Sequence, residues 1–267
     1  MKNKLKFNET KHEYSVGNKK LISVTQLIGK YSDKFDADKI INNMFKSSIS
    51  DKIYIGKKRD YIGMRKDQIN RMWKINSVSK SAYGTYIHNL AEDIANRFKE
   101  NKEVLAYKDM PETKQIFNFF RKEGYEVVET ELRVFSERLG VAGTVDLLLK
   151  KDNKYYIADW KTNTGKDLTL TSNFFNKMLL PPLHHIYSTE YNKYTLQMSI
   201  YRYILEEEDI YQDLEYGESF IVHLIGNIDD LKNKWGKKVI YPEMKRITYK
   251  IINTPYLKEE VESIILK

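Results

Sequence analysis

Residues 143–161 have the sequence GTVDLLLKKDNKYYIADWK, in which two apolar runs flank a short polar segment. Such a pattern predicts a β-hairpin, and Asp152-Asn153 suits a two-residue turn. With that turn Asp146 faces Asp159 across the hairpin, because each lies six residues away from its side of the turn. Lys161 lies two residues after Asp159 and therefore points to the same side of the sheet.

Two facing carboxylates on an apolar hairpin call for a cation. Side chains at facing positions have their Cβ atoms about 4.5–5.5 Å apart, so the two acids repel each other and resist desolvation. A divalent cation offsets that cost directly. The hairpin therefore predicts two acids and an amine around a common cation. An alternative interpretation is that Asp146 and Asp159 are edge-strand carboxylates paired with lysines.

Four motifs together resemble one enzyme family. The segment Gly143-Thr144-Val145-Asp146 and the segment Asp159-Trp160-Lys161 resemble the paired strands of the RecB-like, phage-type exonuclease branch of the PD-(D/E)XK nuclease superfamily. Upstream, Gly84 precedes His88 in an expected helix, as in that branch, and downstream Gln197 and Tyr201 match its Gln-x-x-x-Tyr helix. The four motifs follow the order of the family over residues 84 to 205.

The resemblance implies a set of site residues. The catalytic residues would be Asp146, Asp159, Lys161, Gln197 and Tyr201. The metal ligands would be His88, Asp146, Asp159 and the carbonyl oxygen of Trp160, holding one or two Mg²⁺ or Mn²⁺ ions. The absence of an iron–sulfur cluster follows from the lack of cysteine.

Further residues are candidates for support and for DNA contact. Glu92 lies four residues after His88, hence on the same helix face, and would orient the histidine or bind the metal through water. The candidate DNA contacts are Ser23, Thr25, Thr162 and Tyr194. Ordinary alternatives stay open for most of these residues: an exposed polar stripe for His88 and Glu92, plain N-capping for Ser23 and Thr25, and a core position for Tyr201.

The composition limits the chemistry and suggests a polyanionic partner. The 267 residues contain no cysteine, which excludes disulfides, thiolate zinc sites and a cysteine nucleophile. Oxygen and imidazole ligands remain, and these favour magnesium or manganese. The formal charge of +8 and the pI near 9.2 suit nucleic acid, although a Lys-, Asn- and Ile-rich composition also arises in an AT-rich genome.

The pattern of elements predicts an α/β fold: a central mixed β-sheet flanked by helices, with a restriction-endonuclease-like core and a helical N-terminal part. We expect a single nuclease domain over 1–267, with a hairpin and helical part at 1–80 and the nuclease core at 81–267. The expected elements are a hairpin at 4–22 turning near Gly17-Asn18, a helix starting at Ser23, a helix-rich region at 37–100, a helix from Pro111 to Gly124, strands at 125–135, 141–150 and 154–161, a loop at 162–190, a helix at 191–208, strands at 218–225 and 245–252, and a helix at 257–266.

These expectations describe a Mg²⁺- or Mn²⁺-dependent deoxyribonuclease, most simply a phage-like exonuclease of DNA replication, recombination or repair. The alternatives are a structure-specific endonuclease and a non-catalytic DNA-binding protein on a nuclease fold. The sequence contains no nucleotide-binding P-loop, no apolar run that could span a membrane and no apolar signal-peptide segment after its basic start. We therefore expect DNA as partner, no membrane association, and a cytoplasmic location, in a bacterial host if the gene belongs to a phage. A single-strand-binding or recombination partner protein and an oligomeric state are compatible with this interpretation.

Overall fold

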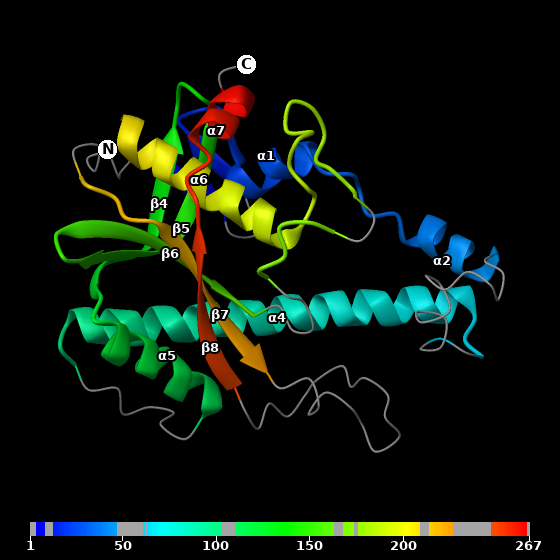
Figure 1. Cartoon of the computed structure of the whole chain (residues 1–267), viewed down its shortest axis with the longest axis horizontal. Helices are drawn as coiled ribbons and strands as arrows, with labels where there is room; N and C mark the ends of the chain where they lie inside the picture. The colour runs from blue at the N-terminus through cyan, green and yellow to red at the C-terminus, as the bar shows by residue number, and fades with distance from the viewer. Residues whose placement is uncertain are drawn as a thin grey trace.

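The computed structural model describes residues 4–8, 13–46, 61, 63–102, 110–162, 168–173, 176–208, 214–226 and 247–265. Within these ranges the chain forms an α/β structure with one mixed sheet and helices on both faces of it (Figure 1). This arrangement confirms the α/β fold class that the sequence predicts. The restriction-endonuclease-like core stays a prediction.

Eight strands make up the sheet within the described residues: β1 Leu5–Asn8, β2 Glu13–Val16, β3 Lys19–Ser23, β4 Glu126–Ser136, β5 Val141–Lys151, β6 Lys154–Lys161, β7 Ser219–Gly226 and β8 Ile247–Thr254. The described helices are α1 Val24–Lys30, α2 Ala37–Lys46, α4 Lys66–Lys99, α5 Pro111–Glu123, α6 Glu190–Glu208 and α7 Lys258–Ile265. From residue 111 onward these bounds agree with the sequence prediction to within about two residues. Phe174 and Phe175, in the expected loop, lie outside the described residues.

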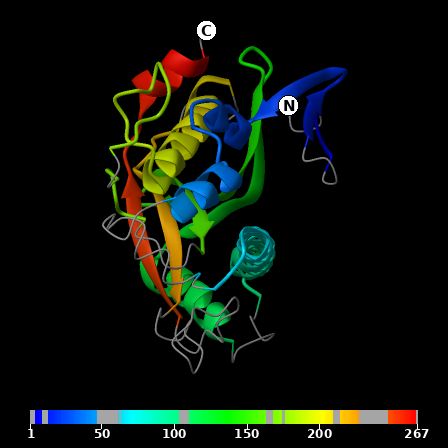
Figure 2. The same cartoon turned by 90° about the vertical axis from the view of Figure 1, so that its right-hand side faces the viewer.

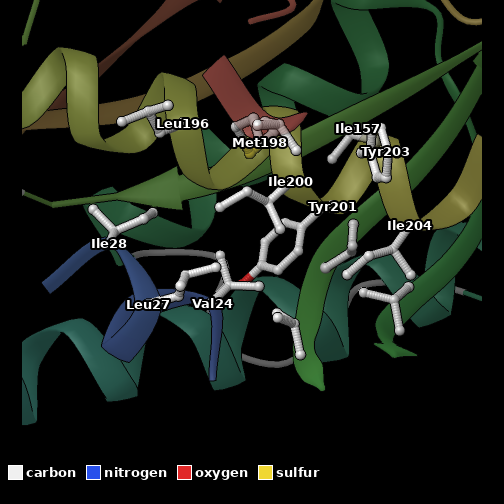
Figure 3. Packing of buried hydrophobic residues seen from close by; sticks show 14 of the residues in the cluster. Val24, Leu27, Ile28, Ile157, Leu196, Met198, Ile200, Tyr201, Tyr203 and Ile204 are labelled. Atoms are coloured by element: carbon white, nitrogen blue, oxygen red, sulfur yellow. The ribbon is translucent and has the colours of Figure 1, made fainter. Parts of the chain in front are cut away.

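The helices divide between the two faces of the sheet. α4 and α5 pack on one face through a buried cluster that includes Ile87, Ile94 and Phe119. α1, α6 and α7 pack on the other face, where Leu196, Ile200 and Tyr201 of α6 meet Val24, Leu27 and Ile28 of α1 (Figure 3). Full burial of such side chains contributes about 1.5–3 kcal/mol each, so each face of the sheet has its own stabilising core.

The central hairpin has the register that the sequence predicts. β5 and β6 pair antiparallel from Leu147 opposite Ala158 to Lys151 opposite Lys154, with Asp152 and Asn153 as the turn. Both turn residues have positive φ, 49° and 61°, as a type I′ turn requires. The ladder ends at Leu147 and Ala158, one pair before Asp146 and Asp159, so the two acids lie where the strands cease to pair.

The strand β5 changes partner along one of its edges. Its whole length pairs with β4 on one side. On the other side it pairs with β6 from Leu147 onward and with β3 only at Val141 and Ala142. Among the described strands none pairs with residues 143–146 on that side. The Gly-Thr-Val-Asp segment therefore lies between two diverging strands, in an opening of the sheet.

The N-terminal part differs in detail from the expected hairpin. The turn at Gly17-Asn18 is confirmed, but it joins β2 to β3, and β1 adds a third antiparallel strand to make a small meander. Figure 2 shows this blue meander projecting from the sheet beside β4 and β5. The helix start is also confirmed: Ser23 caps α1 in a capping box with Gln26. β3 and α1 thereby attach the meander to β5.

The helix α4 is longer than the sequence suggests. It runs without interruption from Lys66 to Lys99, so the expected division between residues 80 and 81 lies inside one helix. Among the described residues, a Cβ atom built on Gly84 would meet Thr162 Oγ1 alone, at 3.8 Å, which is an ordinary contact. Packing against the described residues therefore does not require glycine here. None of the described helices is both long enough and apolar enough to cross a lipid bilayer.

Candidate active site

Three side chains from three elements form a potential metal-binding cluster. His88 of α4, Glu131 of β4 and Asp146 of β5 each offer one ligand atom, and these atoms lie within 4.8 Å of one another. His88 Nδ1 is 3.2 Å from Asp146 Oδ2. The sequence predicts His88 and Asp146 as ligands, and the structure places them together although 57 residues separate them in the chain.

Glu131 is the residue that sequence reasoning missed. After a bulge near Val127, β4 pairs with β5 so that Thr130 faces Leu147 and Leu132 faces Val145. Glu131 therefore lies opposite Asp146. The turn between Ser136 and Val141 fixes this register, so the counting that aligned the two aspartates could have aligned Glu131 as well. Its φ of 45° is uncommon for a residue other than glycine, and such strain is concentrated at functional sites.

Asp159 and Lys161 form a buried ion pair beside this cluster. Lys161 Nζ contacts Asp159 Oδ2, and only 14% of the lysine side chain and 4% of the aspartate side chain are exposed. The ammonium also lies 4.7 Å from the centre of the Tyr194 ring, a cation–π contact. β6 holds the acid and the amine two residues apart, as the sequence predicts.

Trp160 connects the two acids through its backbone. Its N–H donates a hydrogen bond of 2.9 Å to Asp146 Oδ2, at the point where the β5–β6 ladder ends. Its indole is buried in the core beneath α4 and α5, against Phe119 and Phe120. The tryptophan therefore anchors the tip of β6 while its N–H orients Asp146. The role of its carbonyl oxygen as a ligand stays a prediction.

The helix α6 contributes Gln197 and Tyr201, one turn apart. Gln197 Nε2 lies 3.5 Å from Asp159 Oδ1 and donates a hydrogen bond of 3.2 Å to the Tyr201 hydroxyl. The tyrosine ring is buried against Gly143, where an added Cβ atom would come within 2.5 Å of ring atom Cε1. Tyr201 is thus a core residue, as one interpretation held, and it also holds Gln197 toward the site.

The pKa values of the two aspartates shift in opposite directions. Burial raises the pKa of Asp146, but His88, Lys161 and the Trp160 N–H outweigh burial and bring the pKa below its usual value. The pKa of Asp159 is raised by burial and by the charge of Asp146. This is the behaviour of two close carboxylates with too little positive charge around them.

The basic groups retain their protons more strongly than usual. Burial lowers the pKa of His88, but the charge of Asp146 and the hydrogen bond to it raise the pKa to about 9. Burial likewise lowers the pKa of Lys161, and the charges of Asp159 and Asp146 outweigh it and raise the pKa. Acidic groups thus dominate the electrostatics of the site.

The third acid is also short of positive charge. Burial, followed by the charges of Asp146 and Glu92, raises the pKa of Glu131 to about 7. Glu92 follows His88 by one turn of α4, and its charge is among the causes of this shift. A cation bound among these acids would remove the repulsion that raises the pKa of Glu131.

The remaining candidate DNA contacts, Ser23, Thr25 and Thr162, have neighbours within the protein. Ser23 Oγ accepts the Gln26 N–H and lies 3.1 Å from Thr25 Oγ1, so it serves the N-cap of α1. Thr162 follows Lys161 directly and faces Gly84 of α4. Contact of these residues with DNA stays a prediction.

The residues present fit a divalent cation. Their donors are carboxylates, which suit magnesium and manganese, and one imidazole, which suits divalent transition metals. Asp159 Oδ2 is buried and, among the described residues, has no hydrogen bond beyond its ionic contact with Lys161. Burial and the charge of Asp146 raise the pKa values of Asp159 and Glu131, and a cation would offset this. The site can therefore hold a cation next to an ammonium group.

Comparison with known proteins gives no family. No protein-family model matches the chain, and no curated protein matches it.

Proposed function

We propose that the chain is a metal-dependent nuclease that hydrolyses phosphodiester bonds in DNA. One observation supports this most: three ligand atoms from His88, Glu131 and Asp146 lie within 4.8 Å of one another, beside the buried pair of Asp159 and Lys161. Cation ligands next to an ammonium group suit a reaction in which negative charge grows on a phosphate.

In this proposal His88, Glu131 and Asp146 hold Mg²⁺ or Mn²⁺, with Asp159 and the Trp160 carbonyl as further ligands of one or two ions. When bound, such a cation supplies Lewis acidity and lowers the pKa of a water molecule. The Trp160 N–H holds the Asp146 carboxylate in place. Glu92, one turn after His88 on α4, would orient the histidine or bind the metal through water.

The amine and the α6 side chains complete the proposed mechanism. The Lys161 ammonium donates hydrogen bonds to the attacking water or to a phosphate oxygen, and its raised pKa keeps it protonated for this role. Gln197 lies against Asp159, and Tyr201 holds Gln197. Tyr194 lies against Lys161 and limits the positions that the ammonium group can take.

The wider biological role is also part of the proposal. The charge of +8 favours a polyanionic substrate, and the four motifs favour an exonuclease of the PD-(D/E)XK superfamily, with the restriction-endonuclease-like core implied by that family. Such an enzyme would act in DNA replication, recombination or repair. We place it in the cytoplasm, in a bacterial host if the gene is phage-borne.

Digestion of end-labelled linear DNA with Mg²⁺ or Mn²⁺, with and without EDTA, tests the proposal. We expect cleavage that stops with EDTA and falls by at least about a hundredfold in Lys161→Ala, because loss of one charge-stabilising donor costs about 10²–10³ in rate. Lys154→Ala is the matched control: it removes a lysine from the same strand, where an exposed ion pair with Glu215 contributes little.

Three outcomes discriminate between the candidates. Lys161→Ala that cuts at the parental rate would overturn the mechanism. A parent protein that binds DNA but cuts none with either metal would leave the non-catalytic alternative. Cutting of circular DNA as fast as linear DNA would show a structure-specific endonuclease instead of an exonuclease.

A further inference from the structure

The N-terminal half of α4 extends beyond the sheet. Its C-terminal half buries Ile87, Leu90 and Ile94 in the core, whereas before residue 80 only Ile69 and Ser79 are buried. Figure 1 shows this half of the helix continuing past the strands, with α2 beside it. α2 covers one side of it, where Asp38 accepts a hydrogen bond from Asn70. A long helical surface thus begins at the site and leads away from the core.

One stripe of this helix is aligned with His88. Lys74, Ser77, Ser81 and Thr85 precede the histidine at intervals of three or four residues, so they share its face. All four are exposed. From Lys74 to His88 the stripe is about 21 Å long at 1.5 Å per residue. Lys74, Ser77 and Ser81 carry hydrogen-bond donors, and the Thr85 hydroxyl donates to the Ser81 carbonyl oxygen.

The charge on this part of the helix has one sign. Between Asp67 and Glu92 the sequence contains three cationic side chains, Arg71, Lys74 and Lys80, and no carboxylate. Lys74 and Lys80 are exposed, and among the described residues neither forms an ion pair with a carboxylate. Beside the C-terminal end of the stripe, Gly84 lies next to Thr162, which follows β6.

We propose that the stripe Lys74–Ser77–Ser81–Thr85 binds the sugar–phosphate backbone of one nucleic-acid strand and leads it to the cation ligands at His88. The proposal rests on the proposed function and adds where the substrate is bound: the stripe contacts at least about six nucleotides, given a spacing of about 3.4 Å per phosphate along one strand of a duplex. Hydroxyl and ammonium donors contact phosphates without regard to base, so the binding is sequence-independent.

A neighbouring face of the same helix suits a different occupant. Ile75 and Val78 are 46% and 63% exposed, and Ala82 lies on the same exposed side. An apolar face fits a second copy of the chain better than it fits phosphate. Ser81 and Ala82 are adjacent, but they point about 100° apart around the helix, so a carboxylate at each position separates the two faces.

Ser81→Glu and Ala82→Glu therefore make a matched pair with the same change of charge. Affinity is measured by fluorescence anisotropy of a labelled 20-nucleotide strand and of its duplex, in EDTA so that the DNA stays intact. We expect Ser81→Glu to weaken binding by about tenfold through like-charge repulsion, and Ala82→Glu to stay within about twofold of the parent. Lys74→Ala should lower the salt dependence, the slope of log affinity against log salt, by about 0.7 for single strands.

A short diester, thymidine 5′-(4-nitrophenyl phosphate) with Mn²⁺, tests the site alone because it cannot reach Lys74. Equal affinities of Ser81→Glu and the parent for both DNA probes would overturn the stripe, as would an equal loss in Ala82→Glu. If the parent cleaves neither DNA nor the short diester, the proposed function fails, and the anisotropy comparison still decides whether the stripe binds DNA. Comparison of the affinities for the two probes shows whether the stripe prefers single-stranded or duplex DNA.

Discussion

Replacing Gly143 with alanine tests how the sheet and α6 fit together beside the acids. In the structure a Cβ atom at residue 143 would lie 2.5 Å from Tyr201 Cε1 and 3.2 Å from both Cζ and the hydroxyl oxygen. The Tyr201 ring is 4% exposed and is surrounded by the α1 and α6 side chains shown in Figure 3. The ring therefore cannot move away without disturbing its neighbours.

The expected cost is that of overpacking a core, about 1–3 kcal/mol. Since 1 kcal/mol shifts Tm by about 2–4 °C in a chain of this size, Gly143→Ala should melt about 2–12 °C below the parent. The Tyr201 hydroxyl would also move away from Gln197, which lies against Asp159, so we expect cleavage to fall as well. Urea denaturation of the parent and the variant measures the free energy of unfolding.

The control is the same substitution in a chain without the ring. In a Tyr201→Ala background the clash with the Tyr201 ring is absent, and alanine in a strand is about 0.5–1 kcal/mol better than glycine. Gly143→Ala should therefore be neutral or stabilising there. A double-mutant cycle gives the coupling free energy between the two residues. An equal loss of stability in both backgrounds, or none in either, would refute the steric argument.

Three further predictions concern stability and the cation. Gly84→Ala should stabilise the protein by about 1 kcal/mol in urea denaturation, because it improves helix propensity and, among the described residues, the added methyl group meets Thr162 Oγ1 alone, at 3.8 Å. Destabilisation would show a tighter contact there. In EDTA, Glu131→Gln should gain stability relative to the parent as pH rises from 4.5 to 7. The raised pKa of Glu131 gives the parent a stabilising contribution that is complete below the ordinary pKa of 4.5 and is lost as pH rises through the folded-state pKa of about 7. Parallel pH profiles of the two proteins would contradict this prediction. Mn²⁺ at a hundred times its Kd should stabilise the parent by about 2.7 kcal/mol, and Asp146→Asn should lose most of the resulting Tm shift in a thermal melt.

Local sequence patterns predict most of the elements and the register of the central hairpin. A two-residue turn at Asp152-Asn153 fixes which residues of β5 and β6 are paired, because the strand period is two and the turn length leaves one alignment. Short-range patterns also predict the start of α1 at Ser23 and the start of α5 at Pro111. These features depend on neighbours in the chain, so patterns of residue type reveal them.

The assembly of the site depends on contacts between distant segments of the chain. The tertiary structure ended the β5–β6 ladder before the two aspartates, inserted β3 beside Ala142 and brought Glu131 to Asp146 from β4. It also brought His88 and Gln197 to the acids from helices on opposite faces of the sheet. Such contacts join residues tens of positions apart, and they form because each helix buries its apolar face against the sheet. A short-range pattern specifies which face of a helix is apolar, but not which acid its polar side chains will meet.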